Sequence, residues 1–178
     1  LGRPLVPTSG DFGLRTPPPA VPAVLELLAS EFVTRGWSSK SLIRSIVLSD
    51  AYRQSSVAVA GAEDVDPENS MVHRQNRRRL TFESMRDTLV AVSGQLDTRM
   101  GGRPEILTKA PYPLRRAVYS FIDRQDVPSV LRAFDFASPD TSTPERFQTT
   151  VPQQALYLMN NDFLAERARA LAADTGAT

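Results

Sequence analysis

The strongest constraint on the fold is an apolar stripe near the middle of the chain. Its members recur at intervals of three and four positions: Phe82, Met85, Leu89, Val92 and Leu96. This spacing places them on one face of an α-helix. The polar residues between them are predicted to face elsewhere: Glu83, Arg86, Asp87 and Gln95. Because an amphipathic helix owes most of its stability to the burial of its apolar face, we expect residues 82–96 to form the central helix of the core.

Two shorter helices are expected before this stripe. The first has apolar residues at helical spacing and ends before Gly36, a common helix terminator: Val21, Val24, Leu25, Leu28 and Phe32. Ser38 or Ser39 can cap the second, whose buried face would hold Leu42, Ile43, Ile46 and Val47. The pattern predicts an αα-hairpin with Trp37 in its turn, and we expect the hairpin to pack against the central helix.

The segments on either side of the stripe are less regular. Residues 55–66 lose their periodicity and are interpreted as a surface loop. Asp66 followed by Pro67 is typical of a helix start, which predicts a short helix ending near Gln75. Residues 117–122, AVYSFI, are rich in β-branched and aromatic residues and form the best strand candidate. One strand cannot form a sheet, so a partner strand and a small β ribbon are expected.

The last third of the chain is predicted to close the core with helices. Pro128 fits the first turn of a short helix over the sequence VPSVLRAF. Thr150 and Gln153 have the spacing of a capping box before a helix that continues toward Ala170. The sequence Asn-Asn-Asp at 160–162 is expected to kink or recap this helix. The predicted fold class is therefore mainly α, an irregular helical domain around a central amphipathic helix, with an αα-hairpin and a small β ribbon.

Composition narrows the classes of function. The 178 residues suit one domain, 1–178. Twenty-one basic and twenty acidic residues leave a formal charge of +1, so no global field favours nucleic acid. The chain has no cysteine and one histidine, His73, which excludes thiolate metal sites and histidine-rich ones. No apolar run reaches the length of a membrane span, so membrane insertion is not expected.

The densest positive cluster lies just before the central helix and consists of Arg74, Arg77, Arg78 and Arg79. Arginine forks bind sulfate, phosphate or uronate groups well, so the cluster is a candidate site for an anionic ligand. The same arginines could instead pair with carboxylates of the chain, because cations near a helix N-terminus are disfavoured by its macrodipole. The sequence leaves both interpretations open.

A second group of candidates mixes acids and arginines around residues 116–146. The acids are Asp123, Asp135 and Asp140, and the arginines considered with them as binding residues are Arg116, Arg124 and Arg146. If two of the carboxyl groups lay about 5–10 Å apart, they could support glycoside hydrolysis. The nearby arginines favour paired, ionised acids, which are poor general acids. Calcium binding by the loop is a further alternative, although EF-hand spacing is absent.

The loop that carries two of these acids has a distinctive composition. Residues 134–149, FDFASPDTSTPERFQT, contain two prolines, several short polar side chains and no glycine. Such residues bond neighbouring amides and restrict the unfolded chain, which predicts a stiff loop. The loop is either a structural clasp or the rim of a binding site.

Several phrases of the sequence together resemble the planctomycete PSD domain (domain of unknown function 1553). They are GDFGLR (10–15), RGWSSKSLIRSIVLSDAYRQSS (35–56), NRRRLTFESMRDTLVAVSGQLD (76–97), RRAVYSFIDRQ (115–125), FDFASPD (134–140) and TTVPQQALYLMN (149–160). They occur in the order that the family shows and cover nearly the whole chain.

The resemblance implies a large, exported protein, periplasmic or extracellular, in which this domain has neighbours on the same polypeptide. One neighbour is expected to carry a cytochrome-c-like haem, whereas no cofactor is expected here. It also implies further helical sequence before Leu1 and after Thr178. We therefore expect a non-catalytic accessory or interaction domain linked to polysaccharide handling or electron transfer. The alternatives are a hydrolase using the loop carboxylates and a binder of anionic polysaccharide through Arg74–Arg79.

Overall fold

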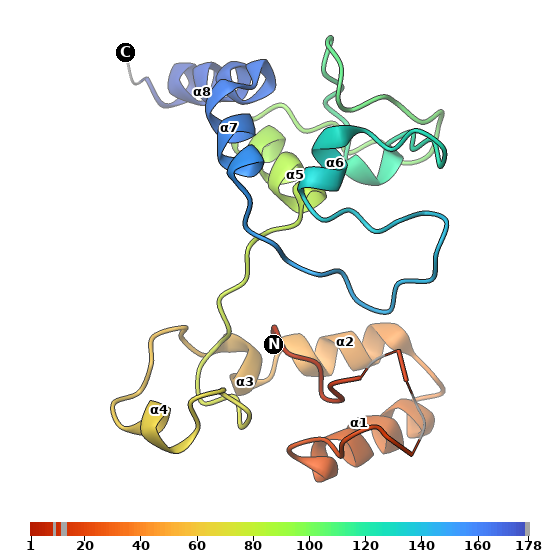
Figure 1. Ribbon diagram of the computed structural model, residues 1–178, viewed down its shortest axis with the longest axis vertical. Coiled ribbons are helices and arrows are strands. Elements are labelled where there is room, and N and C mark those ends of the chain that lie inside the picture. The colour runs from red at the N-terminus through yellow and green to blue at the C-terminus, as the bar shows by residue number, and fades with distance from the viewer. Residues whose placement is uncertain (9, 12–13, 177–178) are drawn as a thin grey trace. The chain divides into compact units, whose positions relative to one another are not determined.

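The computed structural model describes residues 1–8, 10–11 and 14–176, and the chain forms two compact units. Phe12 and Gly13 of the GDFGLR phrase lie outside the described residues. The first unit, Leu1–Arg78, contains α1 (Pro22–Thr34), α2 (Ser39–Val47), α3 (Asp50–Arg53) and α4 (Ala62–Val65). The second unit, from Arg79 onward, contains α5 (Phe82–Val92), the 3-10 helix η1 (Ala117–Tyr119), α6 (Ser129–Ala133), α7 (Pro152–Asn160) and α8 (Asp162–Thr175). Figure 1 labels the α-helices in their order along the chain.

The predicted αα-hairpin is confirmed in the first unit. Helix α1 ends at Thr34, Gly36 takes a positive φ of 69°, and α2 begins at Ser39. The hydroxyl of Ser38 caps α2 by accepting a hydrogen bond from the Ser41 amide at 3.3 Å. Trp37 lies in the turn, and its ring packs edge-on against Phe32 with centroids 5.3 Å apart. Whether the hairpin packs against the central helix stays a prediction.

The helix expected to run from Asp66 to Gln75 is wrong. Asp66 instead follows the single turn of α4, which lies inside the segment interpreted as a loop. Its carboxylate accepts the amides of Ser70 at 2.8 Å and Met71 at 2.7 Å. These two amide donors hold the pKa of Asp66 below its ordinary value. Asp66 does bind main-chain amides, but its side chain closes a turn and does not cap a helix.

The core of the second unit is built on the first turn of α5. Phe82, Val127, Leu131 and Phe134 are buried together, and Met85 and Tyr157 pack against them. The rings of Phe82, Phe134 and Tyr157 form a three-way cluster with centroid distances of 5.4–5.9 Å. Helix α5 contacts η1 and α8, and α7 contacts α6 and α8. The last two helices thus close the core, as the sequence predicts.

The central helix differs from its prediction in length and in buried face. It ends at Val92, because Gly94 turns the backbone into the left-handed region with a φ of 69°, so Leu96 lies outside it. Its buried residues are Phe82, Arg86 and Val90, whereas Val92 is half exposed. The expectation that Arg86 faces away from the core is therefore wrong.

The predicted β ribbon is also wrong, since the described residues form no sheet. Residues 117–119 form η1, and Glu105 pairs with Ser120 in an isolated bridge. A second isolated bridge joins Asp97 to Arg115. The intervening segment contains Pro104, Pro111 and Pro113, whose nitrogens have no hydrogen to donate to a ladder. The β-branched residues thus lie in extended loop and a 3-10 turn.

A local cap sets the start of both α7 and α8, and the cap of α7 lies one residue later than predicted. Val151 is the N-cap of α7, and the Gln154 side chain accepts its amide at 3.5 Å, so the capping box expected at Thr150 and Gln153 is wrong. Asn161 ends α7, and its side chain accepts the Phe163 amide at 2.9 Å to start α8, which confirms the predicted recap. Across the described parts of the chain, each helix is too short or too polar to cross a bilayer.

Candidate functional site

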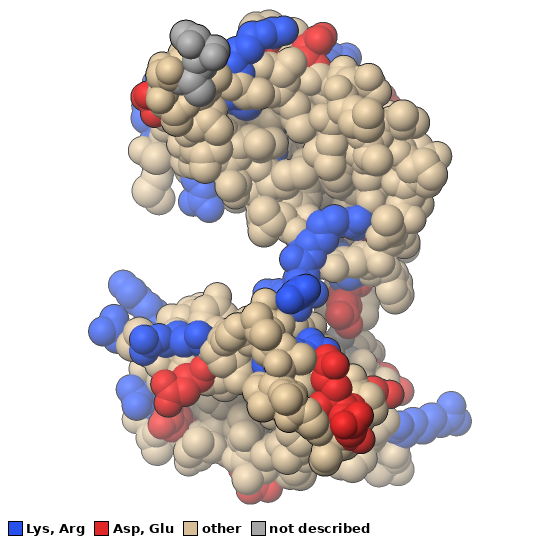
Figure 2. Space-filling model, turned by 90° about the vertical axis from the view of Figure 1, so that its left-hand side faces the viewer, with Lys and Arg blue, Asp and Glu red and all other residues tan. Residues whose placement is uncertain are grey.

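The predicted basic cluster divides into arginines with partners and arginines without. Arg74 lies 3.6 Å from a carboxylate oxygen of Glu63 and is largely buried. Arg77 and Arg78 are exposed, and neither forms an ion pair or hydrogen bond with a residue that the structure describes. On the face drawn in Figure 2, basic and acidic side chains are interspersed. Arg74 is thus paired with a carboxylate, whereas binding of an anionic ligand by this cluster stays a prediction.

Arg79 belongs to a polar assembly that we call the clasp, formed by Arg79, Asp135, Thr149 and Gln154. The guanidinium of Arg79 donates to Gln154 Oε1 at 2.6 Å, to the Thr149 carbonyl at 2.5 Å and to Asp135 Oδ2 at 3.1 Å. Asp135 also accepts the amide and hydroxyl of Thr149 at 2.9 and 2.6 Å. These bonds join the two ends of the 134–149 loop, so the loop is tied at its base.

The carboxylate of Asp135 is held in its charged form. Burial raises its pKa, but the two hydrogen bonds from Thr149 and the charge of Arg79 outweigh burial and leave the pKa below its ordinary value. A general acid must be protonated at the working pH, and a lowered pKa works against that. Asp135 therefore serves as an acceptor that organises the loop.

The other two candidate acids lie elsewhere on the second unit. Asp140 and Arg124 are both exposed, with 3.6 Å between their nearest charged atoms. Asp123 accepts the Gln125 amide at 2.9 Å and lines a pocket together with Asp126, Lys109 and Arg132. Asp123 and Asp126 are acids of one loop with two cations beside them. The structure does not bring Asp123, Asp135 and Asp140 into one cleft.

A pocket beside α5 brings together two of the predicted arginines, and we call it the α5 pocket. Its volume is about 490 Å³, within the range of small-molecule sites. Its apolar lining includes Phe82, Leu107, Ile122, Leu131 and Phe136. Its charged lining consists of Glu83, Asp87, Arg116 and Arg146. Glu83 and Asp87 lie one turn apart on α5 and so share a helix face.

The Glu83 side of the α5 pocket is closed by a strong ion pair. Arg146 Nη1 donates to Glu83 Oε1 at 2.8 Å, and the Arg146 guanidinium lies over the Phe136 ring, 4.9 Å from its centroid. One guanidinium thus pairs with one oxygen of the carboxylate and covers the aromatic face. The other oxygen of Glu83 is buried and has no hydrogen-bond partner among the described residues.

The Asp87 side is built differently, because its carboxylate is committed to the backbone. Asp87 Oδ1 accepts the Ala117 amide at 2.7 Å and lies 3.4 Å from Arg86 Nη1. Arg116 Nε lies 3.9 Å from Asp87 Oδ2, its one charged partner among the described residues. The Arg116 side chain is 60% exposed and makes no hydrogen bond within the described chain. Of the four charged groups in the pocket, Arg116 has the most unused hydrogen-bonding capacity.

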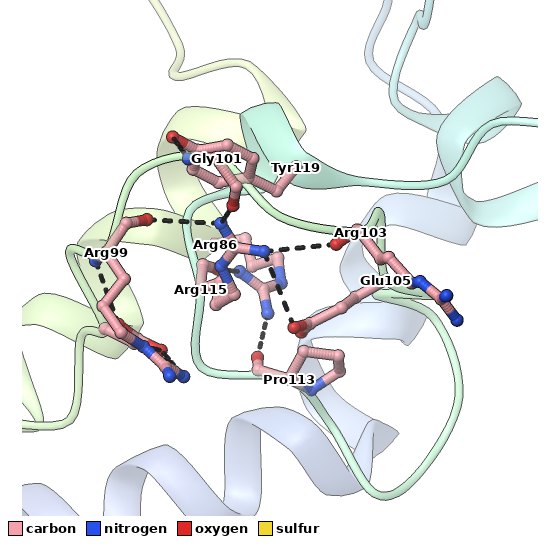
Figure 3. Close-up of polar contacts among 9 residues, drawn as sticks. Arg86, Arg99, Gly101, Arg103, Glu105, Pro113, Arg115 and Tyr119 are labelled. Carbon is pink, nitrogen blue, oxygen red and sulfur yellow. Dashed lines mark hydrogen bonds and ion pairs between the residues drawn. The ribbon is translucent and has the colours of Figure 1, made fainter.

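Two buried arginines, Arg86 and Arg115, hold the segment that leads to Arg116 (Figure 3). Arg86, 2% exposed, donates to the carbonyls of Arg115, at 2.8 Å, and Pro113. Arg115 donates to the carbonyls of Arg99 and Arg103, both at 3.2 Å, and to that of Gly101. Its guanidinium stacks 3.9 Å from the centroid of the Tyr119 ring. Main-chain carbonyls of residues 99–115 thus accept hydrogen bonds from two guanidinium groups, and these bonds organise a segment that forms no β ribbon.

Sequence reasoning missed Glu83 and Asp87 as pocket residues and Arg86 and Arg115 as its support. The i,i+4 spacing of Glu83 and Asp87 in the predicted central helix was an available signal for two carboxylates on one face. For Arg86 no local signal existed, because a charged residue between the apolar positions of an amphipathic helix is ordinarily expected to face solvent. Within the described residues, no group of three or more His, Asp or Glu side chains is placed to hold a metal ion.

Comparison with known proteins returned one finding. A family model described as PSD1, protein of unknown function (DUF1553), matches residues 1–178. Searches of curated proteins and of solved structures gave no match.

Proposed function

The chain belongs to the PSD1 family of proteins of unknown function, and from that premise we propose that its second unit is a non-catalytic accessory unit that binds an anionic ligand at Arg116. The observation that carries the proposal is the state of the charges in the α5 pocket. Both carboxylates already accept hydrogen bonds from the chain, whereas the Arg116 guanidinium is mostly exposed and makes no hydrogen bond with the described residues. An exposed guanidinium beside an apolar pocket offers a forked donor for a carboxylate or sulfate.

The same geometry argues against a hydrolytic role for this pocket. A glycosidase needs one carboxyl group that donates a proton and one that acts as base or nucleophile. Glu83 accepts from Arg146, and Asp87 accepts from Ala117 and Arg86, so both serve as hydrogen-bond acceptors. Turnover of a polysaccharide by the purified protein, abolished by Asp135→Asn or Asp140→Asn, would instead support the hydrolase that the sequence left open.

The anion site is tested by retention on a carboxylate-bearing resin at low salt. Arg116→Ala should elute at clearly lower salt than Arg169→Ala, which removes the same charge from an exposed position on α8. Because both variants change the net charge equally, the difference between them measures the site rather than the overall field. Equal elution of the two variants would contradict the proposal.

A second candidate function rests on Arg77 and Arg78, the exposed members of the basic cluster. Two adjacent arginines without partners in the described chain fit binding of an anionic polysaccharide. An Arg77→Ala/Arg78→Ala variant should then lose salt-sensitive retention on an immobilised acidic polysaccharide. The matched control is Arg103→Ala/Arg169→Ala, which removes two exposed arginines from other surfaces. If both double variants are retained alike, this candidate is rejected.

The cellular setting of the proposal comes from the family resemblance. We propose that the unit works beside neighbouring domains of the same polypeptide, one of them a haem domain, in the periplasm or outside the cell. Pull-down of the intact protein from its host, followed by mass spectrometry of the full-length chain and a haem stain, tests this setting.

A further inference from the structure

The α5 pocket combines an apolar wall with one exposed guanidinium that makes no hydrogen bond to the described residues. Much of its wall is apolar, formed by side chains such as Phe82, Leu107 and Ile122. A ligand that filled it would therefore place an apolar body against this wall. The charge available to that ligand is Arg116, at 60% exposure. These two features describe a ligand with an apolar part and a single anionic part.

Two hydroxyl groups in the pocket lining, those of Thr81 and Ser120, already make hydrogen bonds within the chain. The Thr81 hydroxyl accepts the Ser84 amide at 3.3 Å and donates to the Ser84 hydroxyl at 3.1 Å. The Ser120 hydroxyl points back to the Phe121 carbonyl at 3.4 Å. A sugar ring presents many hydroxyl groups, and each one buried without a partner carries a desolvation cost. In the charged lining, Glu83 Oε2, Asp87 Oδ2 and the Arg116 guanidinium lack a hydrogen bond within the described residues, which leaves few partners for the several hydroxyl groups of a sugar.

The aromatic surface that could receive a sugar ring is also engaged. Arg146 lies over Phe136, 4.9 Å from the ring centroid, and the Glu83 carboxylate holds Arg146 in place at 2.8 Å. A sugar could stack on this face of Phe136 only by displacing a paired guanidinium. An alkyl or aryl group needs no such displacement, because it packs against the apolar side chains that remain.

We infer that the α5 pocket selects an amphipathic monoanion, an alkyl or aryl carboxylate, with its apolar body in the pocket and its carboxylate on Arg116. This inference rests on the proposed anion site and narrows its ligand class. It predicts that affinity rises with apolar length, because each methylene that enters the pocket leaves water. Uronates and other hydroxylated anions gain no such contribution.

The test is a titration of the full 178-residue chain, followed by ¹⁵N–¹H chemical shifts, with hexanoate, octanoate, glucuronate and octanol. Octanoate should bind about tenfold more tightly than hexanoate, from roughly threefold to fourfold per buried methylene. Shifts should concentrate on residues 82–87 and 116–122. Arg116→Ala should weaken octanoate about tenfold, whereas Arg169→Ala should leave it unchanged. Arg116→Lys should restore part of the affinity, since it keeps the charge but loses the fork.

The outcomes separate this inference from the function on which it rests. If glucuronate binds through Arg116 as tightly as octanoate, the anion site stands and the amphipathic class is wrong. If neither anion shifts the pocket residues, both are wrong. If octanol binds as tightly as octanoate, the pocket is apolar but Arg116 is not its anchor, and both proposals are again overturned. Circular dichroism of each variant shows that it is folded before its affinity is compared.

Discussion

Replacing Arg86 by leucine tests whether a buried guanidinium supports the second unit. Arg86 is 2% exposed and donates to two main-chain carbonyls, those of Pro113 and Arg115. Its guanidinium also lies 5.4 Å from the centroid of the Phe163 ring. Leucine keeps the apolar stem but removes both donors. The two carbonyls stay in place, because they belong to the main chain and the substitution changes only the side chain of residue 86.

The expected magnitude follows from those two orphaned acceptors. A buried acceptor without its donor costs about 1–3 kcal/mol, so two give about 2–6 kcal/mol. Burial also lowers the pKa of Arg86, because removing the charged guanidinium from water costs free energy. Leucine carries no charge and so removes this desolvation cost. We therefore expect the free energy of unfolding to fall by about 3 kcal/mol. Arg86→Lys, which can reach one carbonyl at a time, should show an intermediate loss.

The measurement is urea-induced unfolding followed by far-ultraviolet circular dichroism, with amide hydrogen exchange on α5 to localise the effect. Arg169→Leu is the matched control, since Arg169 is exposed on α8, and it should change stability by less than about 0.5 kcal/mol. If Arg86→Leu lost less than about 1 kcal/mol, the carbonyls of Pro113 and Arg115 would have found water or other donors. The role assigned to the buried guanidinium would then be wrong.

Two further predictions use pH. The Asp135 pKa is lowered in the folded state, so its stabilisation is complete above about pH 4, the unfolded value, and is lost as pH falls through the lower folded value. The stability difference between wild type and Asp135→Asn, measured by urea unfolding, should shrink from pH 5 toward acid; a constant difference would contradict the charged clasp. Burial and the neighbouring Tyr112 raise the pKa of Tyr157 to about 12, so this tyrosine favours folding less and less as pH rises from about 10 to 12. Tyr157→Phe should lose less stability over that interval in the same assay, and parallel curves would show that Tyr157 ionises equally in both states.

Local sequence signals predicted the αα-hairpin of the first unit and some of the cap residues. Gly36 and Ser38 act through contacts with residues at most a few positions away, and the structure confirms the turn and the cap that they imply. Asn161 recaps the final helices for the same reason. Such interactions depend on spacing along the chain, which the sequence states directly.

Two of the failed predictions concern segments whose conformation depends on distant partners. Residues 117–122 have strand-like composition, but Ala117 donates its amide to Asp87, thirty positions away, at 2.7 Å, and the segment forms a 3-10 turn. Arg86 interrupts an amphipathic pattern and was assigned to the surface, yet it is buried because two carbonyls from the 113–115 loop converge on it. In both places, hydrogen bonds between residues far apart in the sequence outweigh what the local pattern predicts.

By itself, then, the sequence determined the helical class, the family, the turn of the αα-hairpin and the caps at Ser38 and Asn161. Only the tertiary structure decided which charged side chains are paired within the chain and which remain available to a ligand. It committed Arg79 to Asp135 at 3.1 Å and Arg146 to Glu83 at 2.8 Å, and it left Arg116 beside an apolar pocket with one distant partner. The reason is physical: an ion pair depends on the distance between two atoms, and residues 56 or 63 positions apart come within hydrogen-bonding distance only through the fold.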